Sequence, residues 1–333
     1  MPLRVCVLGA GSWGTSVATL ASRNTPTVLW ARRAETADEI NRARTNERYL
    51  PGAKLPRALR ATASLEEAVR DADVIAVGVP SHGQRAVLEE VRKFIRPWVP
   101  LISLSKGLEQ GTHLRMTEVI RELLPDRRAG VLTGPNLARE IIAGFAAASV
   151  IAIDDEMIAR QLQDVFHSGM FRVYTNRDVI GCELGGALKN VIAIAVGMGD
   201  GLGVGDNTRS AVITRGLAEM TRLGVALGGR AETFAGLAGM GDLVATCISP
   251  QSRNRHVGEQ LGRGRKIEEI IAGMHMVAEG VKTTKVVLEL AARVGVAMPI
   301  AREVHGVLYE GRSAQEAYRG LVRNKPGDEG EPG

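Results

Sequence analysis

The chain has 333 residues, of which 45% are hydrophobic and 24% are charged, and its formal net charge is +5. This length favours two domains of ordinary size, and this composition is typical of a soluble globular protein. The basic residues are scattered in pairs and only 4% of the residues are aromatic, so few side chains are available to stack on bases. We therefore expect small anionic ligands and no nucleic acid.

Targeting and metal-binding signals are lacking in the sequence. Only Arg4 precedes a first strand-like run that ends in a glycine turn, so no secretory signal is expected. The apolar stretches look shorter than the ~20 residues that a membrane helix needs, which predicts a cytoplasmic protein without membrane insertion. Cys6, Cys182 and Cys247 have no CxxC or metal-like spacing and are expected to be reduced thiols. The six histidines form no ligand pattern either, so we predict no metal.

The first half of the chain alternates β-rich runs with stretches of helical length, such as residues 84–95 and 112–123. This alternation predicts βαβ units on a mainly parallel, doubly wound sheet. The fold class is therefore α/β, with a doubly wound, Rossmann-type domain over residues 1–178. Strands are expected at residues 4–8, 27–30, 73–79, 101–104, 131–133, 149–153 and 171–174.

From about Gly181 onward the strand-like runs stop and long helical stretches take over. This change predicts an all-helical substrate domain over residues 179–323, joined to the first domain near residues 176–178. The glycine-rich connections at residues 197–205 and 236–241 either bring backbone close to a ligand or simply turn the chain. The tail at residues 324–333 is rich in Pro, Gly and acid and is predicted to be disordered. Helices are expected at residues 183–198, 210–227, 268–272, 281–294 and 300–310.

The first predicted strand runs directly into residues 9–14, Gly-Ala-Gly-Ser-Trp-Gly, and then into a helical stretch. That context is the one a GxGxxG dinucleotide fingerprint requires. Gly9 permits the tight turn, Gly11 lets a pyrophosphate approach the backbone, and Gly14 lets helix and strand pack closely. The helix N-terminus adds amide groups and a positive dipole, so we predict a dinucleotide cofactor.

Arg32 and Arg33 follow the second predicted strand, where an NAD-specific site usually carries Asp or Glu. Two guanidiniums suit a ribose 2′-phosphate through bidentate, charge-assisted hydrogen bonds. The pair therefore favours NADP over NAD. Two alternatives remain open at this point: an arginine pair that only starts the next helix, and use of both cofactors.

Lys189 lies in one of the most apolar stretches of the chain, residues 183–196, beside Asn190. An ammonium in such surroundings must be paired, shift its pKa or open onto a wet cleft, and each outcome makes it a candidate proton donor. The alternative is a lysine that snorkels from the edge of a buried helix. Lys106 follows a strand end, where it can meet a phosphate or a carbonyl oxygen or can simply be solvated.

Further polar groups stand beside glycines or helix starts in the second half. Asp242 can pair with Lys189, and Thr246 would lie on the same helical face, although Asp242 can also be a simple N-cap. Arg253 and Asn254 resemble an anion clamp, and a solvated basic turn would look similar. Residues 133–138 present a comparable glycine-containing loop earlier in the chain.

The ordered set of these motifs resembles the bacterial NAD(P)-dependent sn-glycerol-3-phosphate dehydrogenase family, over residues 4–310. The glycine motif is generic, whereas the whole set is highly specific. Asn136 departs from the pattern, because many members carry Ser or Thr there. The motifs that carry the resemblance are residues 9–14, 104–109, 133–140, 183–190, 241–247, 252–254 and 277–280.

The resemblance implies reversible reduction of dihydroxyacetone phosphate to sn-glycerol 3-phosphate by NADPH or NADH, with Lys189 as the proton-transfer residue. It also implies a homodimer that supplies glycerophospholipid synthesis. The substrate residues it implies are Lys106, Gly134, Asn136, Lys189, Asn190, Asp242, Thr246, Ser252, Arg253 and Asn254. With Gly9, Gly11 and Gly14, the cofactor residues are Ser12, Trp13, Arg32, Arg33, Tyr49, Lys106, Ala138, Arg253, Val277 and Glu279.

Two other functions compete with this one. A β-hydroxyacid dehydrogenase shares the two-domain plan and a lysine after paired glycines, but its pattern expects an Asn four residues beyond that lysine, where this chain has Ala193. A non-catalytic NADP-binding sensor would not need a buried lysine, an acid and an anion clamp together. The combination of Lys189, Asp242 and Arg253 therefore favours the enzyme.

Overall fold

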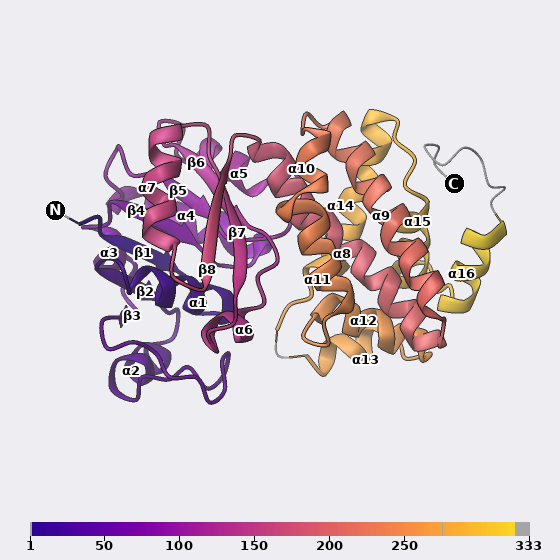
Figure 1. The fold of residues 1–333 in the computed structure, drawn as a ribbon, viewed down its shortest axis with the longest axis horizontal. Coiled ribbons are helices and arrows are strands. Elements are labelled where there is room, and N and C mark those ends of the chain that lie inside the picture. The colour runs from indigo at the N-terminus through magenta and orange to yellow at the C-terminus, as the bar shows by residue number, and fades with distance from the viewer. Residues whose placement is uncertain (1, 275, 324–333) are drawn as a thin grey trace. The chain divides into compact units, whose positions relative to one another are not determined.

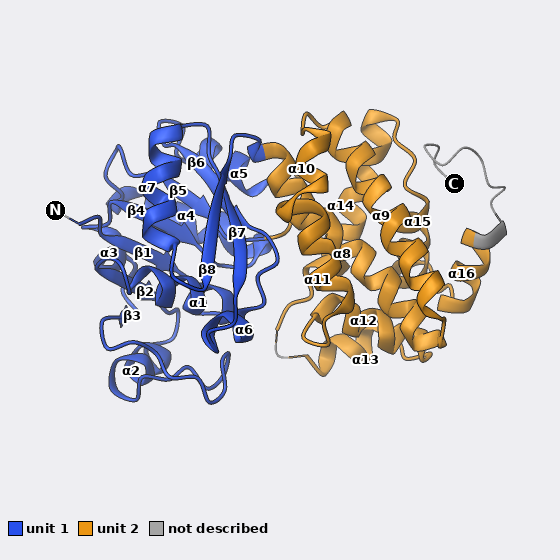
Figure 2. Cartoon of the chain, in the orientation of Figure 1, with its two compact units in different colours: residues 1–105, 114–179 blue, residues 106–113, 180–333 orange. Residues whose placement is uncertain are grey.

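The computed structural model describes residues 2–274 and 276–323, so the tail predicted to be disordered and His275 lie outside the described residues. The backbone groups into two compact units, coloured separately in Figure 2. The first unit combines Met1–Ser105 with Leu114–Val179, and the second combines Lys106–His113 with Ile180–Gly333. The segment Lys106–His113 therefore belongs to the second unit, although the sequence analysis placed it in the first domain.

The first unit contains an eight-stranded sheet with the strand order β3-β2-β1-β4-β5-β6-β7-β8 (Figure 1). Neighbouring strands from β3 to β6 are parallel, β6 and β7 are antiparallel, and β7 and β8 are again parallel. This arrangement confirms the predicted Rossmann-type sheet. The strands are β1 (Val5–Leu8), β2 (Thr27–Trp30), β3 (Arg60–Thr62), β4 (Val74–Val77), β5 (Leu101–Ser103), β6 (Ala129–Thr133), β7 (Ala147–Ala152) and β8 (Phe171–Asn176).

Helices cover both faces of this sheet, which explains why its central strands are apolar throughout. Along β1, Val5 and Val7 join a core cluster with residues of α1 and α7, whereas Cys6 and Leu8 join one with residues of α4 and α5. Side chains alternate in this way because the strand period is two. The helices are α1 (Ser12–Ala21), α2 (Ala34–Arg42), α3 (Leu65–Val69), α4 (Ser81–Val91), the 3-10 turn η1 (Arg92–Phe94), α5 (Met116–Leu123), α6 (Ala138–Ile142) and α7 (Glu156–Phe166).

Every secondary-structure element named in the described part of the second unit is a helix, as predicted, and Lys106–His113 adds a segment without helix. Its apolar side chains form one core cluster around α8. The helices are α8 (Val179–Leu202), α9 (Asp206–Ala226), α10 (Ala231–Ala235), the π-helix η2 (Leu237–Gly241), α11 (Asp242–Ile248), α12 (Arg253–Gly262), α13 (Ile267–Ala272), α14 (Glu279–Val294), α15 (Pro299–Tyr309) and α16 (Ala314–Arg323).

Two expectations for α8 were wrong. The helix continues through the glycines expected to form a connection and ends at Leu202, so it has 24 residues. Of the helices in the described residues, α8 is also long and apolar enough by composition to cross a membrane, whereas the sequence analysis found no such stretch. Within its apolar window, 94% of the residues are buried inside the protein, as in the core helix of a globular domain.

Candidate active site

The glycine-rich loop links β1 to α1, and each of its glycines has a separate structural reason. Gly9 has a φ of +113°, and a Cβ there would lie 2.8 Å from the backbone of Gly78. A Cβ on Gly14 would lie 1.9 Å from the carbonyl oxygen of Gly9, so only glycine fits. At Gly11, the N-cap of α1, no atom lies within 4 Å of such a Cβ. The loop is thus tightly packed on one side and open at Gly11, which fits a pyrophosphate at the helix N-terminus.

A buried asparagine supports this loop, and sequence reasoning missed it. Asn46 is fully buried, and its Nδ2 donates to the carbonyl oxygen of Ala10 at 3.0 Å and to Thr15 Oγ1 at 2.9 Å. Asn46 precedes an irregular turn with no periodic pattern, so no local signal marks it. Trp13 lies on α1, and its ring centroid is 6.5 Å from that of Phe171.

Arg32 and Arg33 lie just past the carboxyl end of β2, and both are exposed. Arg33 is the N-cap residue of α2, and its Nη2 donates to Thr36 Oγ1 at 3.3 Å. The pair thus starts a helix, as one alternative held, and also keeps its guanidiniums in solvent, where a phosphate can reach them. Tyr49 is half-buried, with the Arg48 guanidinium 5.8 Å from its ring centroid.

The loop after β6 also stands at the carboxyl edge of the sheet. Gly134 has a φ of +128°, and Asn136 Nδ2 donates to Ser149 Oγ at 3.1 Å. Asn136 Oδ1 is buried and has no hydrogen-bond partner in the protein. Ala138 begins α6, and its carbonyl oxygen accepts from Ser16 Oγ on α1 at 3.3 Å. The predicted residues of the first unit therefore gather where ligands bind in open α/β sheets.

In the second unit, Lys189 on α8 is only 4% exposed, so the snorkelling alternative is wrong. Its Nζ donates to Thr246 Oγ1 at 2.5 Å and to Asn190 Oδ1 at 3.2 Å. Asp242 Oδ1 lies 3.2 Å from the same Nζ, which confirms the predicted pair. Asp242 is the first residue of α11 and not its N-cap, which is Gly241.

Lys106 completes this cluster from the segment Lys106–His113. Its Nζ lies 2.7 Å from Asp242 Oδ2, so one carboxylate stands between two ammonium groups. The backbone of Lys106 is also held, because its carbonyl oxygen accepts from Asn190 Nδ2 at 2.8 Å. The side chain is 17% exposed, which excludes a freely solvated lysine.

The pKa of Lys189 lies closer to neutral pH than that of a solvated lysine. Burial lowers the pKa of Lys189 from 10.5 to about 8, although the Asp242 carboxylate acts in the opposite direction. The Lys106 ammonium adds to the lowering. A group with a pKa near the working pH can both give and take a proton, which is the requirement for general acid and base chemistry.

The start of α12 brings a second set of polar groups to the cluster. Ser252 is the N-cap and accepts from the backbone N–H of Arg255 at 3.2 Å. Asn254 is buried, and it donates to Asn190 Oδ1 at 2.8 Å and accepts from the Gly280 N–H at 3.0 Å. Arg253 is exposed, and one of its guanidinium nitrogens donates to the carbonyl oxygen of Val277 at 2.7 Å, close to Glu279 at the start of α14.

The structure thus collects the predicted residues into two sets, one in each unit. Gly9, Gly11, Ser12, Trp13, Gly14, Arg32, Arg33, Tyr49, Gly134, Asn136 and Ala138 belong to the first unit. Lys106, Lys189, Asn190, Asp242, Thr246, Ser252, Arg253, Asn254, Val277 and Glu279 belong to the second.

Comparisons with known proteins match both halves of the chain to one family. The family model described as NAD-dependent glycerol-3-phosphate dehydrogenase N-terminus matches residues 4–159, and its C-terminus model matches residues 178–319. The glycerol-3-phosphate dehydrogenase [NAD(P)+] 2 of Sphingopyxis alaskensis is 63% identical over 333 residues, which cover 100% of both chains. The chain belongs to the NAD-dependent glycerol-3-phosphate dehydrogenase family.

Other relatives agree with this assignment. The glycerol-3-phosphate dehydrogenase [NAD(P)+] of Mycobacterium avium is 56% identical over 327 residues, 98% of this chain and 96% of that one. A crystal structure of glycerol-3-phosphate dehydrogenase from Coxiella burnetii superposes with a TM-score of 0.93 at 37% identity, covering 97% of this chain and 99% of that one. The family predicted from the sequence is confirmed, and with it an NAD(P)-dependent oxidoreductase rather than a non-catalytic sensor.

Sequence reasoning missed the residues that hold α12 against α8 in this dehydrogenase. Asp200 on α8 lies 2.7 Å from Arg255 Nε on α12. Asp200 fell in the stretch expected to be a glycine-rich connection. A usable signal was present, because Gly197 and Gly201 have the same four-residue spacing as Gly258 and Gly262, which suits a close helix crossing.

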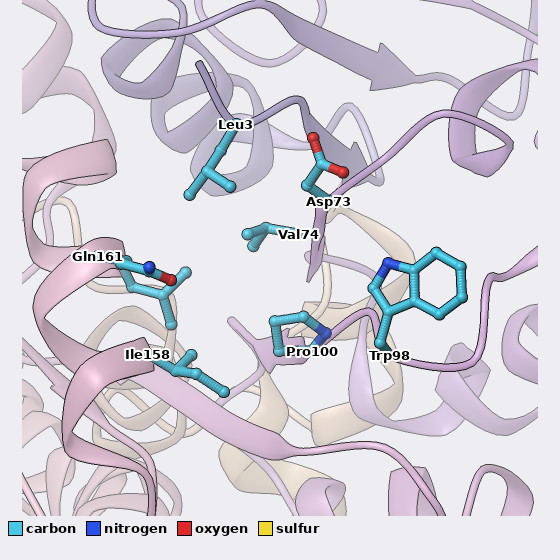
Figure 3. A pocket seen from close by; sticks show the side chains of 8 residues that line it. Leu3, Asp73, Val74, Trp98, Pro100, Ile158 and Gln161 are labelled. Atoms are coloured by element: carbon cyan, nitrogen blue, oxygen red, sulfur yellow. The ribbon is translucent and has the colours of Figure 1, made fainter. Parts of the chain in front are cut away.

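A pocket of about 230 Å³ in the first unit is not part of either set (Figure 3). Leu3, Asp73 and Pro100 in its lining precede β1, β4 and β5, so it opens at the amino ends of the strands. The glycine loop lies at the opposite edge. In the described part of the chain, no group of three or more His, Cys, Asp or Glu side chains is placed to hold a metal ion. The other residues that line the 230 Å³ pocket are Val74, Trp98, Ile158, Gln161 and Leu162.

Proposed function

We propose that the protein reversibly reduces dihydroxyacetone phosphate to sn-glycerol 3-phosphate with NADPH or NADH. The observation that carries this proposal is the buried Lys189 ammonium, 3.2 Å from the Asp242 carboxylate and hydrogen-bonded to Thr246. The nicotinamide, when bound, supplies the hydride that reduces the ketone. The protein must then supply a proton to the oxygen, and Lys189 is the group suited to do so.

In the reducing direction, Lys189 gives a proton from Nζ to the carbonyl oxygen as negative charge develops there. In the oxidising direction, the neutral amine takes the hydroxyl proton. A pKa of about 8 makes both forms accessible near neutral pH. Thr246 and Asn190 fix the direction of Nζ through their hydrogen bonds, so the lysine needs little reorganisation during the reaction.

Lys106 and Asp242 set the electrostatics around this proton. Asp242 contacts both ammonium groups and keeps two cations close together inside the unit. Lys106 adds a second positive charge that stabilises the developing oxyanion. Such preorganised charges favour the transition state because they are already oriented before the reaction.

Arg253 is the group we assign to the substrate phosphate. Its guanidinium is exposed and offers further donors beyond the one used by Val277. Asn254 already bonds Asn190 and Gly280, so it offers at most its second amide hydrogen. Following the resemblance, Ser252, Gly134 and Asn136 complete the substrate residues. Binding the phosphate away from the reacting carbon would orient the ketone for hydride transfer.

The cofactor is assigned to the glycine loop, with the pyrophosphate over Gly11 and the N-terminus of α1. Arg32 and Arg33 are assigned to the 2′-phosphate of NADPH, which gives the preference for NADP. By resemblance, Ser12, Trp13, Tyr49, Lys106, Ala138, Arg253, Val277 and Glu279 also contact the cofactor. Arg32→Asp with Arg33→Ser should weaken NADPH use far more than NADH use, and equal losses would show that the pair does not read the 2′-phosphate.

The direct test is nicotinamide absorbance with purified protein and dihydroxyacetone phosphate, comparing NADPH and NADH. Lys189→Ala should lower kcat by about 10²- to 10⁴-fold, since general acid catalysis contributes that much. Lys285→Ala, at an exposed position of α14, is the matched control and should leave kcat unchanged. If NADPH binds but is not oxidised, the substrate is another phosphorylated ketone or a 3-hydroxyacid.

We further propose that the enzyme works as a cytoplasmic homodimer without membrane insertion and supplies glycerophospholipid synthesis. The family resemblance supports this assignment. Light scattering on the purified protein should give the mass of two chains, and the mass of one chain would contradict the dimer. Depletion of the protein in its cell should lower glycerophospholipid synthesis, and added glycerol 3-phosphate should restore it.

A further inference from the structure

Two helices of the second unit carry most of the polar cluster, so their spacing decides its geometry. α8 carries Lys189 and Asn190, and α12 begins with Arg253 and Asn254. The contact between Asn190 Oδ1 and Asn254 Nδ2, at 2.8 Å, joins the two sets. A small shift of α12 along α8 would break this bond.

The two helices meet backbone to backbone at glycines. A Cβ on Gly197 of α8 would lie 2.0 Å from the carbonyl oxygen of Arg255. A Cβ on Gly258 of α12 would lie 2.0 Å from the carbonyl oxygen of Ile194, and one on Gly262 would lie 2.3 Å from that of Met198. Without side chains between them, the helices can approach closely, but glycines alone do not define how far one slides past the other.

A buried ion pair supplies the missing restraint. The Asp200 side chain on α8 is 6% exposed, and its Oδ2 accepts from Arg255 Nε of α12 at 2.7 Å. Its Oδ1 accepts from Nε and Nη2 of Arg209, on α9, at 2.9 and 2.8 Å. One carboxylate thus binds two guanidiniums, of which only Arg255 belongs to the helix that carries Arg253 and Asn254.

Arg255 is also tied to the start of α12 through the backbone. Its N–H donates to the N-cap oxygen of Ser252 at 3.2 Å, and Arg253 and Asn254 lie between these two residues in the chain. A guanidinium fixed on Asp200 therefore fixes the first turn of α12. The same first turn of α12 also holds the start of α14, because Asn254 Oδ1 accepts from the Gly280 N–H.

We propose that the Arg255–Asp200 ion pair is a positioning device that sets where Arg253 and Asn254 stand relative to Lys189. This inference rests on the proposed function, because it concerns how the substrate phosphate is held. Arg255 and Asp200 do not touch the substrate. They act through Arg253 and Asn254. Loss of the Arg255–Asp200 pair would displace these two residues by a fraction of the helix pitch.

The test compares Arg255→Ala with Arg209→Ala, because both remove one guanidinium from the same carboxylate. Arg255→Ala should lower kcat/KM for dihydroxyacetone phosphate by about tenfold to 100-fold, mainly through KM, since a displacement of about 1 Å can have such an effect. Arg209→Ala should change kcat/KM by less than about threefold, because Arg209 lies on α9 and its loss should displace Arg253 and Asn254 by much less than about 1 Å. Both should lower the melting temperature by similar amounts. Arg255→Lys, which restores one positive charge to Asp200, should recover part of the loss.

Hydrogen exchange at the Gly280 amide provides a readout that does not depend on activity. We expect faster exchange in Arg255→Ala than in wild type, and no change in Arg209→Ala. Equal losses of kcat/KM in both variants, or unchanged exchange at Gly280 in Arg255→Ala, would overturn the inference and leave only a stabilising ion pair. A wild-type protein that does not oxidise NADPH with this substrate would instead overturn the proposed function, while the exchange measurement would still decide the inference.

Discussion

The glycine loop of the first unit and the Lys189 cluster of the second are built in opposite ways. The loop comes from one continuous stretch, residues 9–14, and presents backbone at a helix N-terminus. The cluster collects side chains from four separate segments, which include Lys106, Lys189, Asp242 and Asn254. A local sequence motif can therefore predict the glycine loop, whereas the Lys189 cluster forms only after the helical unit has folded.

The two constructions also differ in what they tolerate. The loop depends on the absence of side chains, so any Cβ at Gly14 disrupts it. The cluster depends on the balance of charges, so substitutions that keep the shape can still change its chemistry. Added methyl groups therefore test the loop, and substitutions that change charge but keep the shape test the cluster.

Among the changes that compare these two constructions, the largest effect is expected from Gly14→Ala, which tests whether the loop depends on packing. The added methyl group would lie 1.9 Å from the carbonyl oxygen of Gly9, so the loop and α1 must move apart. We expect a lower melting temperature and an NADPH affinity reduced by about 100-fold, since the loss of a few phosphate hydrogen bonds is worth that much. Calorimetric titration with NADPH and thermal unfolding measure the two effects.

Gly11→Ala is the matched control within the same loop. No atom lies within 4 Å of the new methyl group, so the melting temperature should stay close to that of wild type. The methyl group would still occupy the open surface assigned to the pyrophosphate, so NADPH affinity should fall. Wild-type affinity in Gly11→Ala would place the pyrophosphate elsewhere.

The second prediction concerns the charge balance of the cluster and uses the pH dependence of the reaction. Reduction needs protonated Lys189, so kcat/KM should fall as the pH rises through about 8, the pKa of that lysine. Asp242→Asn removes the carboxylate that opposes the effect of burial, so the pKa should drop further and the fall should begin at lower pH. Lys106→Gln removes a neighbouring positive charge and should move the fall to higher pH.

Profiles of kcat/KM against pH for the three proteins check this prediction. Both variants are expected to be less active overall. The quantity to compare is therefore the pH at which kcat/KM falls, and not the maximum value of kcat/KM. Movement of both profiles in the same direction would contradict the assignment of the fall to Lys189. Oxidation of glycerol 3-phosphate serves as the internal control, because it needs the neutral amine and should rise with pH over the same range.

Sequence reasoning succeeded where the signal is local. The β1 strand, the glycine loop and α1 follow directly from residues 4–21, and the apolar surroundings of Lys189 announced its burial. It failed on β3 (Arg60–Thr62), because three residues at a sheet edge are too few to show a period. It also ended α8 too early, because glycine disfavours helices on average, whereas Gly197 and Gly201 are needed for the approach of α12.

The segment Lys106–His113 shows a different limit. Nothing in its sequence indicates that it leaves the sheet domain and joins the helical one. It does so because Leu108 is buried in the core of the second unit and Lys106 pairs with Asp242, partners that lie far along the chain. Long-range partners of this kind are not encoded in a local period.

Glu219 shows that burial of a charge does not by itself identify a catalytic group, and it gives the prediction with the smallest effect on activity. It is 2% exposed on α9, and its carboxylate accepts from the N–H groups of Ile300 at 2.6 Å and Ala301 at 3.4 Å. These N–H groups lie in the first turn of α15, so Glu219 serves to cap a helix, whereas Lys189 pairs with the carboxylate of Asp242. Burial raises the pKa of Glu219 from 4.5 to about 7.

The pH dependence of stability separates these two kinds of buried charge. Because the folded pKa of Glu219 is the higher one, the folded state holds its proton more tightly, and stability is lost as the pH rises from about 4.5 to about 7. The loss should reach about 3 kcal/mol in the free energy of unfolding. Glu219→Gln cannot titrate, so urea unfolding at pH 5 and pH 8 should show a smaller difference than in wild type, with kcat unchanged. An equal difference in unfolding free energy between pH 5 and pH 8 in both proteins would mean that Glu219 is charged in the folded state throughout this range. A lower kcat in Glu219→Gln would show that Glu219 contributes to the reaction.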